Sequence, residues 1–249
     1  MPIIRSTIAA LAVAMTAGCA LNPPSNTSTA SAPRVQVTEV SRSGVSANSV
    51  WVICTVPLNL RAAPDPQADR ITMLGRGTRL DISERRTVSA DTWLHVKTES
   101  GQFEGWVLDR SDLVIHRSVS LHVEQTSGYS FFFPSEWVPT SGNPATFAGP
   151  ATAAGGSLLI QTADDPAKLT ATPTAAGHEL RQEAPVEVYG RTTYLTTYKL
   201  DAGGYEHAVR LQFPKTKVAY LFDFKQPGTD PDSALFKQLL SSVIVPGED

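Results

Sequence analysis

The sequence LNLRAAP at residues 58–64 decides the fold that we expect for the middle of the chain. Leu58 and Leu60 alternate with polar residues, which is the period of a strand with one buried face. A turn rich in proline follows at residues 62–66 and ends this strand. The stretch therefore predicts the beginning of a small β barrel. Residues upstream are expected to deliver and tether the protein, and residues beyond about 115 to form a second domain.

Strand and turn signals recur at short intervals between residues 50 and 115. Runs that are apolar or alternate between apolar and polar are separated by short turns, several of which contain glycine. The predicted strands are residues 51–56, 58–61, 71–74, 80–82, 93–97, 103–107 and 113–115. Strands this short and this closely spaced predict a small all-β barrel at residues 49–116.

Four features in this order resemble the bacterial SH3 domain family. They are the LNLR strand with its proline, the turn Arg76-Gly77-Thr78, the strand that contains Trp93, and the sequence Gly105-Trp106-Val107. The resemblance covers about 65 residues of the chain. It implies attachment to the cell wall or to another envelope component, because such domains commonly accompany enzymes and adaptors that act on peptidoglycan.

The resemblance also implies a binding groove with an aromatic floor. Trp93 or Trp106 would offer a flat face to a sugar or a peptide, and Arg61 or Asp109 would supply polar contacts. The alternative is that both tryptophans belong to the core of the barrel. Arg61 could equally be a solvated strand residue.

Residues 1–19 have the composition of a secretory leader, with Arg5, an apolar run at residues 8–15 and small residues after it. That run is too short for the ~20 residues that a membrane-spanning helix needs, so we expect the leader to be cleaved. The sequence TAGC at residues 16–19 resembles a bacterial lipobox, although Thr16 stands where leucine is usual. The resemblance implies lipidation of Cys19. The alternative is an ordinary signal peptide that is cut near Ala17 or Ala20.

Residues 20–48 are rich in Ser, Thr, Asn, Ala and Pro and contain few large apolar side chains. Such a segment buries too little surface to offset its ordering entropy, so it predicts a disordered tether. Acyl chains on Cys19 would hold the protein on a membrane without a spanning helix. Ala20 stands where an aspartate would resemble an inner-membrane retention signal. We therefore expect an envelope protein that, in a bacterium with two membranes, sits on the outer membrane facing the periplasm.

Residues 117–249 are expected to form a second domain in which strands dominate. One helix is predicted near the end, because Asp230 suits its N-cap and Pro231 its first position. Apolar residues then recur at helical spacing, namely Phe236, Leu239, Leu240 and Val243.

The second domain resembles the PsbP-like α/β sandwich. The resemblance rests on a glycine-aromatic strand that ends in Pro-x-x-Trp, a Val-x-Val-x-Gly strand, a long hairpin and a last helix that ends in SVIV. Members of that family are mostly non-catalytic binding or assembly factors, which implies the same here. The fold class that we predict is thus an SH3-like barrel followed by an α+β domain, with an antiparallel sheet and a C-terminal helix.

The pattern of charged and nucleophilic residues argues against several functions. A net charge of −3 opposes non-specific nucleic-acid binding, which depends on basic patches. Cys54 stands among apolar residues and is predicted to be a buried thiol, so it does not suit a papain-like site. The adjacent Asp164 and Asp165 precede a proline and predict a helix cap or a turn.

Metal and cofactor sites are not predicted either. The histidines show no His-Glu-x-x-His or comparable spacing and are expected to be surface or strand residues. These are His95, His116, His122, His178 and His207. No Gly-x-Ser-x-Gly elbow or phosphate-binding loop occurs in the sequence. We therefore expect a protein that is not an enzyme and that holds neither a metal nor another cofactor.

These observations predict a non-catalytic, lipid-anchored envelope protein that binds peptidoglycan or an envelope protein through its SH3-like domain. An accessory subunit or inhibitor that regulates a cell-wall enzyme is the alternative. A hydrolase of unknown type is a third possibility.

Overall fold

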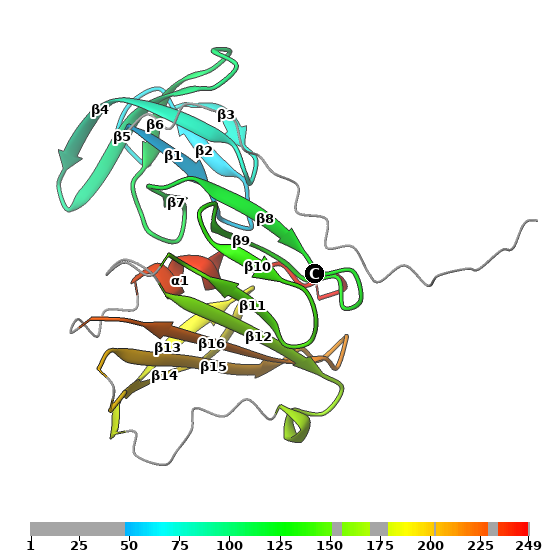
Figure 1. The fold of residues 1–249 in the computed structure, drawn as a ribbon. Helices are drawn as coiled ribbons and strands as arrows, with labels where there is room; N and C mark the ends of the chain where they lie inside the picture. Colours follow the sequence, from blue (N-terminus) through cyan, green and yellow to red (C-terminus); the bar gives the residue numbers. More distant parts are fainter. Residues whose placement is uncertain (1–47, 151–155, 170–178, 202, 229–233, 249) are drawn as a thin grey trace, which may run out of the picture. The chain divides into compact units, whose positions relative to one another are not determined.

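A computed structural model describes residues 48–150, 156–169, 179–201, 203–228 and 234–248 of the chain. Cys19 and the predicted leader and tether up to residue 47 lie outside these ranges, as do Asp230 and Pro231. Within them the protein is mostly β, with antiparallel sheets and one α-helix near the C-terminal end (Figure 1). This confirms the predicted excess of strands and the predicted final helix.

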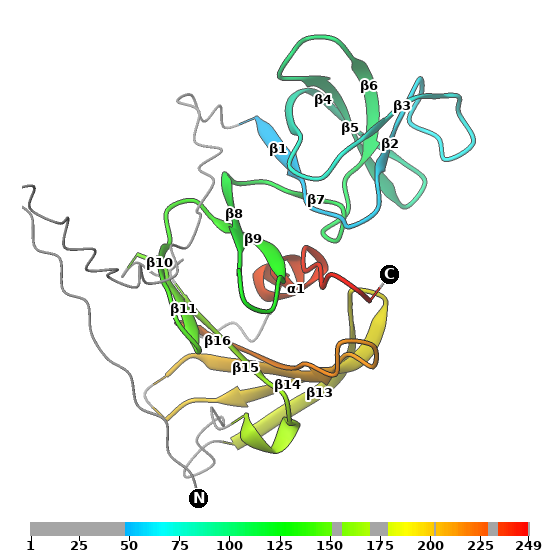
Figure 2. The same cartoon turned by 90° about the vertical axis from the view of Figure 1, so that its right-hand side faces the viewer.

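Seven short strands form the first sheet, in the order β3-β2-β6-β5-β4-β1-β7 (Figure 2). They are β1 (Ser49–Val52), β2 (Leu58–Arg61), β3 (Arg70–Leu74), β4 (Arg79–Val88), β5 (Asp91–Thr98), β6 (Glu104–Leu108) and β7 (Val114–Ile115). Every one of these strands contributes an aliphatic side chain to a single buried cluster. The sheet must therefore curl around that cluster. Leu58 and Leu60, whose alternation predicted the first buried face, both belong to it.

Two strands of this sheet end more than two residues away from the predicted position. β1 ends at Val52 instead of residue 56, and β4 continues to Val88 instead of ending at residue 82. Residues 84–88 are all exposed, so no alternation of apolar and polar side chains marks them as a strand. The backbone ladder with β5 holds them, from Glu84 opposite His95 to Val88 opposite Asp91.

At two positions of the SH3-like pattern the backbone geometry explains why the residue is glycine. Gly77 has a φ of 83°, a left-handed conformation in the turn where the Thr78 hydroxyl donates to the carbonyl oxygen of Gly75 over 2.7 Å. Gly105 lies where β6 comes close to β2. A Cβ atom at Gly105 would stand 2.6 Å from the carbonyl oxygen of Arg61, so only glycine permits this approach without a shift.

Residues beyond 118 form a second sheet, a two-stranded ribbon and the helix. The sheet has the order β10-β11-β12-β16-β15-β14-β13, and the ribbon pairs β8 with β9. The strands are β8 (Val119–Val123), β9 (Ser130–Pro134), β10 (Val138–Thr140), β11 (Ala145–Ala148), β12 (Ser157–Ala163), β13 (Glu179–Val188), β14 (Arg191–Lys199), β15 (Tyr205–Gln212) and β16 (Ala219–Gln226). Helix α1 (Ala234–Ser241) follows, and a 3₁₀ turn η1 (Pro166–Lys168) is capped by Asp165, as predicted.

The core of this part is built largely from aromatic side chains. Phe131 from the ribbon, Phe147 and Phe222 from the sheet and Phe236 from the helix all join one buried cluster. The ribbon and the helix therefore cover the same face of the second sheet (Figure 1). Aromatic rings account for much of the apolar surface that is buried here.

A smaller cluster crosses residue 116, where we predicted a domain boundary. Trp51 and Ile115 from the first sheet pack with Val119 and Phe132 from the ribbon. The guanidinium carbon of Arg76 lies 4.5 Å from the centroid of the Phe132 ring, and burial lowers the pKa of Arg76 to about 10. Both sides of residue 116 fall within the same compact unit. The division into two domains remains a prediction.

Candidate functional site

The side chains of β5 alternate between the two faces of the first sheet. Leu94 and Val96 point into the aliphatic cluster, so Trp93 and His95 lie on the outer face. Trp93 is 3% exposed and Trp106 on β6 is 7% exposed, yet neither belongs to that cluster. Both rings are thus buried on the outside of the curled sheet by neighbouring side chains.

Four residues form a row across this outer face. Arg61 on β2 lies opposite Trp106 on β6, Trp106 opposite His95 on β5, and His95 opposite Glu84 on β4. Directly opposed residues of antiparallel strands have Cβ atoms about 4.5–5.5 Å apart, so these four side chains are neighbours on the sheet. A β-bulge between Ile82 and Glu84 precedes the end of the row on β4.

The indole ring of Trp106 is covered from two sides. The His95 ring lies 4.9 Å away between centroids at 60°, and the guanidinium carbon of Arg86 lies 4.8 Å from the centroid of the indole. A cation over a ring at such an exposed position contributes about 0.5–1 kcal/mol. The Arg86 side chain is itself 51% exposed, so solvent reaches the cation that covers Trp106.

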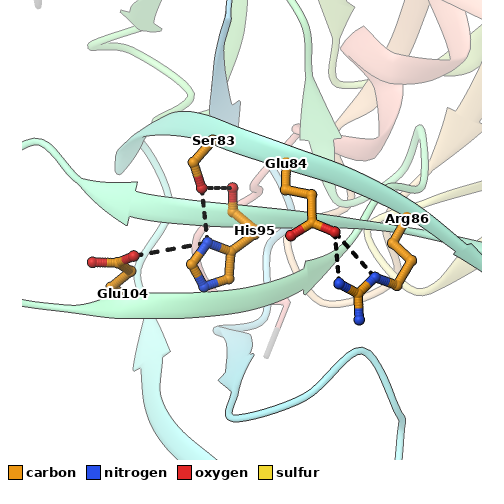
Figure 3. Close-up of polar contacts among 5 residues, drawn as sticks. All are labelled: Ser83, Glu84, Arg86, His95 and Glu104. Atoms are coloured by element: carbon orange, nitrogen blue, oxygen red, sulfur yellow. Dashed lines mark hydrogen bonds and ion pairs between the residues drawn. The ribbon is translucent and has the colours of Figure 1, made fainter.

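A carboxylate holds Arg86 in this position. Its Nε and Nη2 both donate to one oxygen of Glu84, over 3.1 and 2.7 Å (Figure 3). Exposed ion pairs contribute about 0–1 kcal/mol, so a competing carboxylate could replace Glu84 at little cost. We call the group Ser83, Glu84, Arg86, His95, Glu104 and Trp106 the Trp106 cluster.

The polar contacts that Ser83 and Glu104 make with the His95 ring both involve Nδ1 (Figure 3). Ser83 Oγ lies 2.7 Å from Nδ1 and also donates to the His95 carbonyl oxygen over 3.1 Å. A hydroxyl has one proton, so this assignment makes Nδ1 the donor and leaves Nε2 as an acceptor. Glu104 Oε1 stands 3.8 Å from the same Nδ1. A Ser-His-acid relay needs both ring nitrogens, so these three residues do not form one.

Residues 57–114 match the family model of the bacterial SH3 domain. All members of the Trp106 cluster lie within the matched residues, which we call the SH3 region. The match confirms the resemblance stated from the sequence, and a bacterial SH3 domain suggests a role in binding peptidoglycan or a protein.

A solved structure is similar to about half of the chain. It is cyanobacterial PsbP (CyanoP) from Synechocystis sp. PCC 6803, at 18% sequence identity and a TM-score of 0.37. The similarity covers 51% of this chain and 92% of that protein. It agrees with the PsbP-like resemblance expected from the sequence. No curated protein sequence matches the chain.

The SH3 region brings three of the four predicted ligand-binding residues to one face. Arg61 and Trp106 are opposed directly, and Trp93 lies opposite Arg86. Arg61 Nη1 donates to the carbonyl oxygen of Ala68 over 2.7 Å, which ties the side chain to the turn after β2.

The fourth, Asp109, is engaged elsewhere. Its carboxylate lies 2.9 Å from Arg85 Nη1 and 2.7 Å from His116 Nε2. The prediction that Asp109 supplies a ligand contact thus concerns a carboxylate that already has two partners. Whether any of the four predicted residues binds a ligand stays a prediction.

We did not predict from the sequence that β4 continues through residues 83–88, which complete the Trp106 cluster. Glu84 and Arg86 alternate at a spacing of two, as a strand facing Trp93 and His95 requires, and this polar alternation was the available signal.

Cys54 lies in the aliphatic cluster of the first sheet, 4% exposed, as predicted. Burial raises the pKa of its thiol. In the ranges that the structure describes, no three His, Cys, Asp or Glu side chains group as they would around a metal ion. No helix in those ranges is long and apolar enough to cross a bilayer.

Proposed function

We propose that this chain is a non-catalytic, lipid-anchored protein of the cell envelope that binds peptidoglycan or an envelope protein through its SH3 region. The match of residues 57–114 to the bacterial SH3 domain carries the proposal. The Trp106 cluster supports it, because an aromatic ring, a cation, two carboxylates and an imidazole acceptor meet on one exposed face.

The cluster suits a ligand that combines a carboxylate with a flat or apolar surface. A ligand carboxylate would take Arg86 from Glu84, and the guanidinium would move away from the indole. Trp106 would then offer its face to a sugar ring or an apolar side chain. Peptidoglycan has both features, in its peptide carboxylates and its sugar rings.

Replacing Arg86 tests this surface. Loss of a charge-assisted hydrogen bond costs about 1.5–3 kcal/mol, so Arg86→Gln should weaken co-sedimentation with purified peptidoglycan about tenfold or more. Arg110→Gln is the matched control, since Arg110 is an exposed arginine of the SH3 region whose partner is Asp112. Equal sedimentation of wild type and both variants would remove the Trp106 cluster from the proposal.

The anchor is tested separately. We expect wild-type protein in the membrane fraction of cells and Cys19→Ser in the soluble envelope fraction, because the acyl chains would be missing. A wild-type protein that is already soluble would contradict the anchor and leave the proposed binding by the SH3 region intact.

Crosslinking in intact cells distinguishes the two classes of partner. Recovery of peptidoglycan fragments supports wall binding. Recovery of one cell-wall enzyme, without sedimentation on purified wall, would favour the role of accessory subunit or inhibitor. Lysis zones in zymograms against cell walls would contradict the non-catalytic part of the proposal.

A further inference from the structure

A pocket of about 270 Å³ opens in the C-terminal part of the chain, remote in sequence from the SH3 region. Its walls come from β8 and the turn after it, from the segment before β11 and from β12. The volume is near the lower end of the range for small-molecule pockets, which is about 300–1,000 Å³. It suits a ligand built on a single ring or a short chain.

The inner wall of this pocket is apolar and well packed. Tyr129, Ala145 and Ile160 line it, and each is at most 2% exposed. His122 also lines it, at 2% exposure, with its ring edge-on to Phe147 at 5.0 Å between centroids. A ligand that entered would replace water next to mostly apolar side chains, which favours a ligand with an apolar body.

The polar groups around the pocket are largely satisfied by one another. Asn143 donates to the Thr162 carbonyl oxygen over 2.7 Å and accepts from the Thr162 amide over 3.0 Å. Glu124 accepts from the amides of Thr126 and Ser127 and from the Ser127 hydroxyl. These side chains shape the pocket without needing a ligand.

His122 is different. Neither of its ring nitrogens has a hydrogen-bond partner in the described part of the chain, and both are closed to solvent. A buried polar group without a partner is costly, so a hydroxyl that reached this wall could stabilise the protein with a small shift of the ring.

Charge decides between classes of ligand. Burial lowers the pKa of His122 to about 4, so the imidazole is neutral near pH 7. Glu124 is the charged side chain among the lining residues, and hydrogen bonds from Ser127 and Thr126 help to lower its pKa despite partial burial. An anion would therefore meet a carboxylate and no cation. A cation would find that carboxylate already bound by three donors.

We propose that this pocket binds a small neutral molecule with an aromatic or aliphatic body and one hydroxyl group. The site is independent of the function proposed for the SH3 region, and its failure would leave that function untouched.

Three probes of one shape test the proposal, namely benzyl alcohol, benzoate and benzylammonium. Each is titrated into the isotope-labelled full chain while the NMR signals of Ala145, Ile160 and His122 are followed. We expect saturable shifts with benzyl alcohol and affinities at least tenfold weaker for the two ions. Shifts that do not saturate with any probe would overturn the proposal, as would equal or tighter binding of either ion.

A variant at the mouth localises the binding. Ser141 is an exposed lining residue, so Ser141→Trp should abolish the shifts by filling the entrance. Val138→Trp is the control, because Val138 is 65% exposed and does not line the pocket. Unchanged binding by Ser141→Trp would assign the shifts to another site and overturn the proposal. Equal loss in both variants, with wild-type melting temperatures, would do the same.

Discussion

The SH3 region and the C-terminal part use aromatic residues in opposite ways. In the first sheet the core is aliphatic, and Trp93 and Trp106 lie on the outer face beside charged side chains. In the C-terminal part the rings form the core themselves, and titratable groups such as His122 are buried with them. The first arrangement places the Trp106 ring under an exposed arginine that a ligand could displace. In the second arrangement the rings stabilise the core, and the titratable groups buried with them make the stability depend on pH.

The largest effect should come from the aromatic core. Phe147 is fully buried and has Phe131 and Phe133 about 5 Å away between centroids. Phe147→Ala should lower the free energy of unfolding by about 3–5 kcal/mol, because it removes a ring and leaves a cavity. Urea unfolding followed by circular dichroism measures this. A loss below about 1 kcal/mol would mean that the aromatic core is not the tightly packed part that we describe.

The next largest loss of stability is expected in the SH3 region, where one glycine lies against the backbone of a neighbouring strand. Gly105→Ala should cost about 1–3 kcal/mol, since the new Cβ would meet the carbonyl oxygen of Arg61 and backbone yields little. Gly75→Ala is the matched control, because nothing lies within 4 Å of its Cβ position and its φ is not positive. The difference between the melting temperatures of the two variants is the measurement. Equal melting temperatures would contradict the close approach of β6 to β2.

The smallest effect is a pH dependence that belongs to the C-terminal part. Burial and then the charge of Glu206 raise the pKa of Asp223 to about 7, so its contribution to stability is present below about pH 4 and is lost as the pH rises through 7. Burial lowers the pKa of His122 to about 4, so its contribution is present above about pH 6.5 and is lost as the pH falls through 4.

Two variants separate these opposite slopes. Asp223→Asn should remove the decline between pH 4 and 7, and His122→Gln should remove the loss on acidification, each with a slope of about 1 kcal/mol per pH unit. Free energies of unfolding at pH 4, 5.5 and 7 provide the test. If wild type and Asp223→Asn show the same pH profile, Asp223 is not the group that titrates.

Local patterns predicted much of this fold. The alternation of Leu58 and Leu60 identified the buried face of β2, and the spacing of Phe236, Leu239 and Leu240 identified the helix whose buried side they form. Such signals lie within a few residues of one another and depend on which side chains leave water. These local signals do not depend on how the strands pair over long distances in the sequence.

The candidate site needed information that the local sequence lacks. Arg86 covers Trp106 because β4 extends beyond its buried part, and strand pairing at exposed positions leaves no hydrophobic pattern. The histidines show the same limit. His122 and His207 are strand residues, as one of the two expected alternatives had it, and both are fully or almost fully buried. Their burial depends on aromatic residues far away in the sequence.

The bulge in β4 has a consequence for how related chains should be aligned. Before it, the even-numbered Leu80 and Ile82 point toward the aliphatic cluster, whereas after it the even-numbered Glu84 and Arg86 lie on the outer face. One additional residue thus inverts the parity of the strand. Deleting Ser83 would remove the extra residue and leave Glu84 opposite His95 and Arg86 opposite Trp93, so the outer face would keep its side chains although every later residue number falls by one. A comparison that counts identical residues but ignores a one-residue gap here would therefore match side chains from opposite faces.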